Sequence, residues 1–260
     1  MANNVMHKWY DAAKRRSSVR DYTGPVDRDT FYELKRFAQT LTTEDARIEI
    51  RAKGGVLDMP KLLPNIGVAG TNCFAAVIVR DHNDYMGGYL GEAFVLECAS
   101  RGGVGTCWLG GTYKRGAAKQ YFDLESDERI VCVISFGKCS DFPKPPAKRS
   151  AEQLTGLDTE TIRALPAWQQ DAIRIAKTAP SARNRQPWEL EIKPGCIGVI
   201  CNSNNFGFGD VDCGIAMLHI EVGAAKQNVY GDWQINGGEK LFVSFSHGQA
   251  PVSEAPEQQE

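Results

Sequence analysis

Apolar side chains recur at helical spacing along several segments of the chain. Between residues 31 and 41 they fall three or four positions apart, after Asp27 and Asp29, which are favourable at a helix N-terminus. Residues 88–100 are mostly apolar on every side, which predicts a buried helix. Two further helices are expected at residues 159–178 and 212–227.

The predicted strands follow two patterns. Residues 47–51 alternate between charged and apolar side chains, as in a strand with one exposed face. Residues 74–79 are apolar without interruption, and residues 130–136 are rich in β-branched side chains, as in buried strands. Three further strands are expected at residues 188–192, 197–201 and 241–245.

The order of predicted elements repeats. Each half of the chain reads helix, strand, strand, helix, strand. The segment Arg36-Phe-Ala-Gln-Thr40 precedes one strand much as Arg174-Ile-Ala-Lys-Thr178 precedes its counterpart, which supports the repeat. Prolines between residues 141 and 149 disfavour helix and sheet and predict an extended connector. The expected organisation is a first half at residues 1–140, a connector at 141–157, a second half at 158–248 and a disordered tail at 249–260.

Composition and charge limit the classes of function. The chain has 260 residues, 42% of them hydrophobic, which is enough for a substantial core. Its net charge of −2 gives no overall basic field, so nucleic acid is not expected as a partner. No stretch approaches the ~20 apolar residues of a membrane span, and the polar N-terminus lacks the apolar run of a secretory signal. We therefore expect a cytoplasmic protein without a membrane partner.

The cysteines and histidines predict packing rather than metal binding. The 8 cysteines include no C-x-x-C pair, and the 4 histidines include no H-x-x-x-H pair. Several cysteines stand in apolar runs, where a reduced thiol acts as a small hydrophobe. His219 lies among apolar residues, and Trp168 and Trp233 have the bulk of core residues. We expect no metal site. We place His219 in the core rather than in catalysis, and Trp168 and Trp233 in the core or in the packing between the two halves rather than in substrate stacking.

Side chains that could bind a cofactor are concentrated in three segments. The first is Arg15-Arg-Ser-Ser-Val-Arg-Asp-Tyr22, in which arginines flank two adjacent hydroxyls just ahead of a helix. Such a cluster offers charged and neutral donors to a phosphate dianion. On this segment alone, a solvated charge run is the better interpretation.

The second segment is Ala179-Pro-Ser-Ala-Arg-Asn-Arg-Gln-Pro-Trp188. Its prolines stiffen the backbone, and its serine, asparagine and glutamine can present hydrogen-bonding edges to a planar polar ring. A helix stop would explain the same prolines. The third segment, from Ala99 to Gly111, is rich in glycine, so its backbone N–H groups can approach a cofactor closely. It lacks the G-x-G-x-x-G spacing after a strand, which excludes a Rossmann dinucleotide site.

Together, the three segments resemble the nitroreductase family of FMN enzymes. In that family an R-x-S-[VI]-R-x-[FY] start, a P-S-x-x-N-x-Q-P-W loop and a G-[LV]-G-[ST]-C-W-[LI]-G loop build the flavin site. The resemblance spans residues 16 to about 228. It implies an α+β, nitroreductase-like fold made of two degenerate half-repeats, with antiparallel central sheets flanked by helices.

The resemblance also implies roles for individual residues. The start segment and the basic pair of the connector would meet the FMN phosphate, ribityl chain and pyrimidine edge, and the second segment would line the ring from the other side. The Gly110 backbone N–H would face flavin N5. The implied cofactor residues are Arg16, Ser17, Ser18, Arg20, Trp108, Leu109, Gly110, Gly111, Lys148, Arg149, Pro180, Ser181, Ala182 and Asn184. Arg183 and Arg185 are candidates for contact with substrate or nucleotide, with plain solvent exposure as the alternative.

The chain departs from the family pattern in one respect. Ordinary members are homodimers, and each flavin site takes the start motif from one subunit and the N-x-Q-P-W loop from the other. Here the first half keeps the start motif and the Gly loop, but Thr42-Thr-Glu-Asp-Ala-Arg47 replaces the N-x-Q-P-W loop. The second half keeps that loop but carries Tyr230-Gly-Asp-Trp-Gln234 in place of the Gly loop. The resemblance therefore implies a fused pseudo-dimer with one FMN site between its halves, able to work as a monomer.

Three functions remain open at this point. The first is an NAD(P)H:acceptor oxidoreductase, in which NADH or NADPH delivers hydride to flavin N5 and a nitroaromatic, quinone or similar aromatic acceptor then takes the electrons. The second is a narrower flavin reaction, such as reductive dehalogenation or ene reduction. The third is an FMN carrier or sensor without turnover. No acid–base side chain is expected, because the flavin supplies the electron chemistry.

Overall fold

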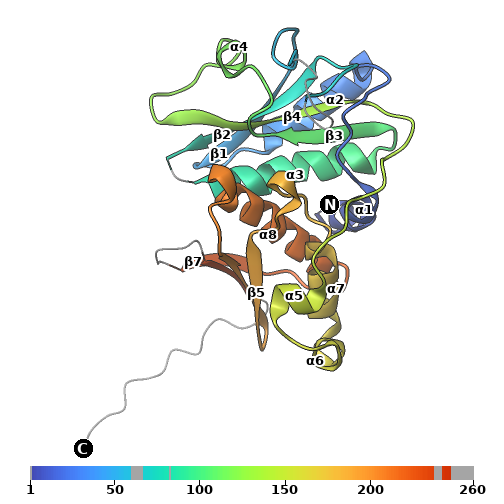
Figure 1. The fold of residues 1–260 in the computed structure, drawn as a ribbon, viewed down its shortest axis with the longest axis vertical. Coiled ribbons are helices and arrows are strands. Elements are labelled where there is room, and N and C mark those ends of the chain that lie inside the picture. The colour runs from blue at the N-terminus through green and yellow to red at the C-terminus, as the bar shows by residue number, and fades with distance from the viewer. Residues whose placement is uncertain (1, 60–66, 82, 237–241, 247–260) are drawn as a thin grey trace, which may run out of the picture.

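The computed structural model describes residues 2–59, 67–81, 83–236 and 242–246, and its strands form two antiparallel sheets (Figure 1). The first sheet has the order β1-β2-β4-β3, and the second has the order β5-β6-β8-β7. The predicted α+β fold with antiparallel sheets is confirmed. The strands are β1 (Ala46–Ala52), β2 (Cys73–Arg80), β3 (Val104–Leu109), β4 (Glu128–Lys138), β5 (Trp188–Lys193), β6 (Cys196–Cys201), β7 (Asp232–Asn236) and β8 (Phe242–Ser246).

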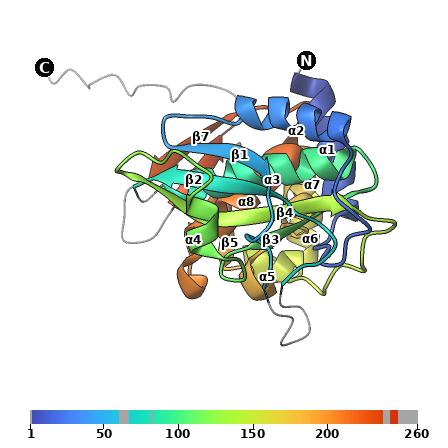
Figure 2. The same ribbon diagram turned by 90° about the horizontal axis from the view of Figure 1, so that it is seen from above.

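Two long helices, α3 and α8, lie between the sheets and pack against each other (Figure 1). Viewed from above, the first sheet lies over both of them (Figure 2). No helix in these described ranges is long and apolar enough to cross a membrane. The helices are α1 (Ala2–Arg15), α2 (Arg28–Thr40), α3 (Asp84–Ser100), α4 (Arg115–Lys119), α5 (Ala151–Thr155), α6 (Thr159–Ala164), α7 (Ala167–Ala176) and α8 (Gly209–Ala225), with 3₁₀ turns at Ala182–Asn184 and Asn205–Gly207.

The two halves share one topology. The elements α2, β1, β2, α3, β3 and β4 of the first half correspond in order to α7, β5, β6, α8, β7 and β8 of the second. Corresponding strands occupy corresponding positions in the two sheets. The largest apolar core cluster draws residues from both halves, including Phe94 and Phe136 of the first and Trp188 and Phe245 of the second. The halves are therefore two copies of one pattern that share a core.

The helix predicted over residues 159–178 is broken, and this prediction is wrong in detail. The structure has α6 up to Ala164 and α7 from Ala167, with Leu165 extended at ψ 156° between them. The reason is Pro166, whose ring disfavours helical backbone at the preceding residue and which has no N–H to donate. The connector predicted at 141–157 likewise contains a short helix, α5, at Ala151–Thr155.

Among the described residues, two strands and three helices are absent from the sequence-based prediction; the helices are α1, α4 and α5. The segment taken as a Gly-rich loop contains β3, and the segment around Trp233 contains β7, at the same position of each half. The polar N-terminus forms α1, which buries Trp9 and Ala13 against α3 and α8. The predicted tail at 249–260 lies outside the described residues.

His219 is fully buried and Trp168 is nearly so, whereas Trp233 is half-buried; both tryptophans pack against Phe245. None of the eight cysteines forms a disulfide, and all but Cys196 are buried. The burial predicted for His219, Trp168 and the cysteines in apolar runs is confirmed.

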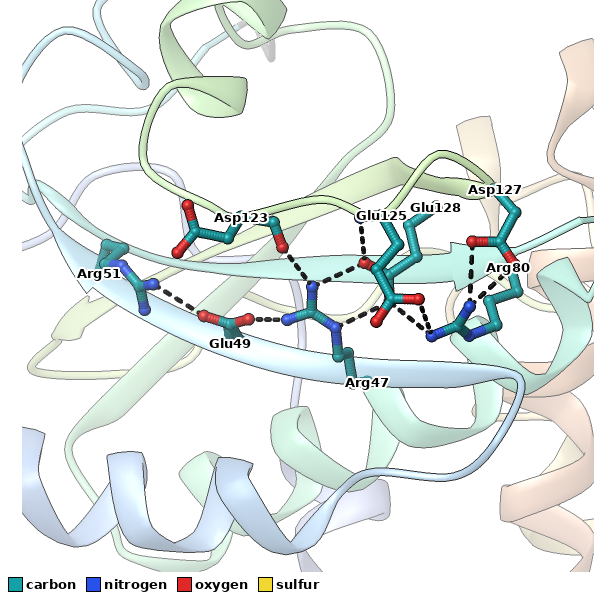
Figure 3. Close-up of polar contacts among 8 residues, drawn as sticks. All are labelled: Arg47, Glu49, Arg51, Arg80, Asp123, Glu125, Asp127 and Glu128. Carbon is teal, nitrogen blue, oxygen red and sulfur yellow. Dashed lines mark hydrogen bonds and ion pairs between the residues drawn. The ribbon is translucent and has the colours of Figure 1, made fainter.

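A network of ion pairs covers the outer face of the edge strand β1 (Figure 3). Arg47 donates to both carboxylate oxygens of Glu128, at 3.0 and 2.8 Å, and also pairs with Glu49. Glu49 in turn pairs with Arg51, and Arg80 pairs with Asp127 on the far side (Figure 3). Charged side chains along an edge strand disfavour pairing with a strand of another molecule.

Replacing Glu128 by glutamine is expected to lower the free energy of unfolding at pH 7 by roughly 2–3 kcal/mol, since one pKa unit corresponds to about 1.4 kcal/mol. The hydrogen bonds from Arg47 lower the pKa of Glu128 to about 2, and its side chain is only 4% exposed. Because the folded-state pKa is depressed, this stabilisation is present above the unfolded pKa of about 4.5 and is lost as pH falls towards 2.

Urea unfolding at pH 7 and pH 3 checks this prediction. The difference between wild type and Glu128→Gln should shrink at the lower pH. The exposed Glu44→Gln variant is the control and should behave as wild type at both values. A difference that stays constant with pH would mean that the carboxylate charge of Glu128 does not matter.

Candidate functional site

A cavity of about 660 Å³ lies where the start segment, the connector and the 179–188 loop meet. Its size falls within the ~300–1,000 Å³ typical of cofactor and ligand sites. Both halves of the chain contribute to its walls. The sequence-predicted residues that line it are Arg16, Ser17, Ser18, Arg20, Lys148, Pro180, Ser181, Arg183 and Asn184.

The start segment is held between the first sheet and the connector. It leaves the end of α1, and its Val19 N–H donates to the carbonyl of Thr106 on β3 at 2.9 Å. Ser18 pairs with Thr106 as an isolated parallel bridge, and the Ser17 hydroxyl donates to the carbonyl of Pro143 in the connector. The segment is therefore fixed in the wall of the cavity. It is not the solvated run of charges that was the better interpretation of this segment taken alone.

Two basic side chains face this cavity without an acidic partner. Arg16 is only 6% exposed, and in the described part of the chain no carboxylate forms an ion pair with it or with Lys148. Burial, and then the charge of Arg16, lower the pKa of Lys148 to about 8. Lys148 donates to the carbonyl of Ala179 at 2.8 Å. Buried cations are unfavourable unless paired, so this end of the cavity is suited to an anion.

The 179–188 loop has an unusual backbone. Arg183, Asn184 and Gln186 have φ values of 52°, 56° and 50°, in the left-handed region where residues other than glycine are rare. Such residues cost about 1–3 kcal/mol each and occur preferentially at functional sites. The loop is held by hydrogen bonds from the Gln186 N–H to Ser181, from Asn184 to the carbonyl of Ala147 and from the Ala182 N–H to Asp212.

Four buried polar side-chain atoms in the described structure lack a hydrogen-bond partner: Arg16 Nε, Asn184 Oδ1, Gln186 Nε2 and Trp188 Nε1. All four belong to the start segment or to the 179–188 loop. Buried polar groups without partners are rare in folded proteins and need a specific explanation. A polar ligand bound between the two segments would supply the missing partners at Arg16 and Asn184, which both line the cavity.

The Gly-rich segment does not line this cavity through its side chains. Trp108 points into the core and donates from Nε1 to Glu92 at 2.9 Å, while Leu109 is buried on the opposite face of the sheet. Gly110 is packed by Phe208, since a Cβ at this position would lie 2.4 Å from the Phe208 ring. Gly111 has no neighbour within 4 Å of such a Cβ. At residues 109–111, therefore, only backbone atoms are available to contact a cofactor ring.

Arg149, Arg185 and Ala182 do not line this cavity. Arg149 donates to the carbonyls of Gln186 and Trp188 and so ties the connector to the second half. Together with the exposed Arg185 it lines a neighbouring hollow of about 560 Å³ instead of the cavity. Ala182 contributes its backbone N–H to Asp212. Of the basic pair in the connector, only Lys148 lines the cavity.

Sequence reasoning missed residues of α8 and of the turn before it. Asp212 is 2% exposed, accepts hydrogen bonds from Ala182 and Asn205, and has a pKa raised to about 7 by burial. The exposed ring of Phe206 lies 4.6 Å below the guanidinium of Arg183. The sequence signal that could have identified Asp212 is its position at the start of an apolar helix. A carboxylate buried there requires hydrogen-bond partners, which marks it as a residue with a specific role.

A family model described as "Putative TM nitroreductase" matches residues 8–224. A "putative nitroreductase" from Thermotoga maritima is 19% identical, with a TM-score of 0.63 over 92% of this chain and 93% of that chain. A "putative nitroreductase in complex with FMN" from Exiguobacterium sibiricum is 14% identical, with a TM-score of 0.43 over 55% of this chain and 93% of that one. A "putative NADH oxidase" from Clostridium acetobutylicum is 18% identical, with a TM-score of 0.41 over 56% and 96%. No curated protein sequence matches the chain.

Proposed function

Because the chain belongs to the nitroreductase family described as "Putative TM nitroreductase", we propose that it binds FMN between its halves and passes electrons from NADH or NADPH to an aromatic acceptor. The observation that carries the proposal is the pair of unpartnered buried polar atoms that line the cavity from its two sides, Arg16 Nε in the start segment and Asn184 Oδ1 in the 179–188 loop. We also propose that a single chain suffices, since both segments belong to one polypeptide.

The residues of the cavity fit FMN by chemistry. Arg16 and Lys148 would neutralise the phosphate, and Ser18 would donate to its oxygens or to the ribityl chain. The Ser17 hydroxyl, whose proton goes to the carbonyl of Pro143, would accept a hydrogen bond from the ribityl chain. Asn184, with its free Oδ1, would meet a ring N–H, and the Gly110 N–H would lie at N5. Bound FMN would supply the two-electron chemistry. Positive charge held by this protein near the pyrimidine edge would favour the reduced, more negative form.

The mouth of the cavity offers a place for the second substrate. Arg183 lines the cavity, and its guanidinium lies over the ring of Phe206, which is 60% exposed. Phe206 also lines the neighbouring hollow, as does Arg185. An exposed aromatic ring with arginines at the same site suits an aromatic ligand that carries negative charge. Nicotinamide dinucleotides have this character.

An FMN carrier without turnover is the second candidate. The observation that favours it is Phe208, which packs directly on Gly110, the residue expected beside flavin N5. A ring covering that position would hinder hydride delivery. The two candidates differ in one measurable respect, which is the rate of reduction by a nicotinamide nucleotide.

The test is the visible spectrum of the purified protein, followed without oxygen after addition of NADPH or NADH. We expect a flavin spectrum with about one FMN per chain, because one complete set of motifs is present, and rapid bleaching by one nucleotide. Gel filtration should show FMN bound to the monomer. A yellow protein that neither nucleotide bleaches would favour the carrier. A protein that takes up no FMN would contradict both candidates.

A further inference from the structure

A fully buried carboxylate, Glu92 on α3, lies in the interface between the two halves. Its Oε2 accepts from Trp108 Nε1 at 2.9 Å, and its Oε1 lies 3.0 Å from His219 Nε2 on α8. Both Glu92 and His219 are 0% exposed. The pair therefore joins the two long helices at the centre of the molecule.

The same histidine is connected to the cavity. Its Nδ1 lies 3.1 Å from the hydroxyl of Thr178 and 3.1 Å from the carbonyl of Ile175. Thr178 is half-buried, follows α7 and lines the cavity beside Pro180 and Ser181. A continuous chain of hydrogen bonds thus runs from Glu92 through His219 and Thr178 to the wall of the candidate FMN site.

Packing alone does not account for this chain. Apolar residues of similar size are often at least as stabilising as a buried carboxylate and imidazole, because the polar pair must be removed from water. In the described structure no lysine or arginine forms an ion pair with Glu92. Lys148 interacts electrostatically with Glu92, and also with Arg16 and Asp212. The surroundings therefore leave His219 as the immediate partner that can balance the charge of Glu92.

The hydrogen-bond geometry allows His219 to hold or release one proton at Nδ1. With both ring nitrogens protonated, Nε2 donates to Glu92 and Nδ1 donates to the carbonyl of Ile175 or to Thr178. The Thr178 hydroxyl itself donates to the carbonyl of Ile175 at 2.7 Å, so its oxygen is placed to accept the Nδ1 proton. To pass its own proton on, the hydroxyl turns away from that carbonyl. With Nδ1 unprotonated, Nε2 still donates to Glu92, and the turned hydroxyl donates to Nδ1.

We propose that Glu92 and His219 hold a proton for the reaction in the cavity and deliver it through Thr178. This inference rests on the proposed FMN-dependent function. The reduction of a quinone to a hydroquinone takes a hydride, that is two electrons and one proton, which NADH or NADPH supplies, and one further proton. In the step proposed, Nδ1 loses its proton to Thr178 Oγ1 while the hydroxyl proton of Thr178 passes to the ligand. His219 becomes neutral, Glu92 stays a carboxylate, and water replaces the proton through the same hydroxyl after product leaves.

The test compares two electron acceptors in single turnovers of the reduced FMN-loaded protein. Benzoquinone needs protons as well as electrons, whereas ferricyanide takes electrons only. Thr178→Val keeps the shape of the side chain and removes the hydroxyl, and Thr178→Ser restores it. We expect Thr178→Val and His219→Gln to slow reoxidation by benzoquinone at least about tenfold, since a positioned proton donor contributes roughly 10²–10⁴-fold. Reoxidation by ferricyanide should not change, and Thr178→Ser should react as wild type.

A second readout needs no turnover. In the FMN-free protein, the ¹⁵N NMR signal of His219 Nδ1 should shift in Thr178→Val and keep its wild-type position in Thr178→Ser. The signal is assigned by its loss in His219→Gln. If that variant does not fold, the test rests on the comparison of Thr178→Val and Thr178→Ser with wild type. Equal slowing with both acceptors, or no slowing with benzoquinone, would overturn the relay while leaving FMN binding intact. A protein that binds no FMN would instead overturn the proposed function.

Discussion

Replacing Arg16 by methionine should lower the affinity for FMN roughly 100-fold or more, because loss of one partner of a buried charge pair costs about 2–5 kcal/mol. The guanidinium is 6% exposed, has an unpartnered Nε and lies near Lys148, whose pKa it helps to lower. In the absence of an anion, the buried Arg16 and the half-buried Lys148 repel each other. The same substitution should therefore leave the FMN-free protein as stable as wild type, or more stable.

Fluorescence titration of FMN and thermal unfolding of the FMN-free protein check the two parts. Arg15→Met is the matched control, since it removes the same charge one residue earlier, from an exposed side chain at the end of α1. We expect it to change FMN affinity by no more than a few-fold, because an exposed charge is screened by solvent and salt. An Arg16→Met protein that binds FMN as wild type would exclude Arg16 from the anion site.

The residues that line the cavity could be predicted because they lie close together in the sequence. The hydroxyls beside Arg16 and the amides beside Pro180 occupy two short segments, and each segment reaches the cavity as one unit. The backbone at Asn184 and its neighbours limits the conformations that the second segment can adopt, since a loop with several left-handed residues persists only when its surroundings fix it. The local sequence was therefore sufficient to predict most of the residues that line the cavity.

The residues that the prediction misplaced depend on distant contacts. Lys148 and Arg149 are neighbours with the same charge, yet one faces the cavity and the other binds the carbonyls of Gln186 and Trp188. Only the position of the connector relative to β5 decides between them. Phe208 reaches Gly110 across the interface of the two halves, and no pattern within either half reports that contact.

The elements missed in the fold have local causes. The segment that contains β3 has the composition of a loop, because glycines precede Trp108 and two more follow Leu109. Nevertheless, the residues from Thr106 to Leu109 pair with β4. Its counterpart β7 is short and begins at Asp232, an acid that is unfavourable in strands. Both strands occupy edges of their sheets. Exposed residues weaken the apolar pattern of β7, whereas β3 is largely buried and was hidden by the glycines around it.

The strongest constraint on the whole arrangement is the contact between α3 and α8, which holds the two halves together. A Cβ at Gly214 would lie 1.8 Å from the carbonyl oxygen of Tyr85, and one at Gly88 would lie 2.0 Å from the carbonyl oxygen of Val211. Both obstacles are backbone atoms, so no side chain can rotate away to make room. The helices can pack this closely only because both positions are glycine.

Gly214→Ala is therefore expected to destabilise the protein by about 3 kcal/mol or more, at the upper end of the usual effect of overpacking. It should also weaken FMN binding, because the cavity takes its walls from both halves and a shift of α8 moves Asp212 and the loop bonded to it. Urea unfolding and FMN titration measure the two effects. Gly116→Ala in α4 is the control, since its Cβ would meet nothing within 4 Å, and it should stabilise the protein by roughly 0.5 kcal/mol. A Gly214→Ala protein with wild-type stability would mean that α3 and α8 do not approach each other in this way, and the single cavity between the halves would then lose its structural basis.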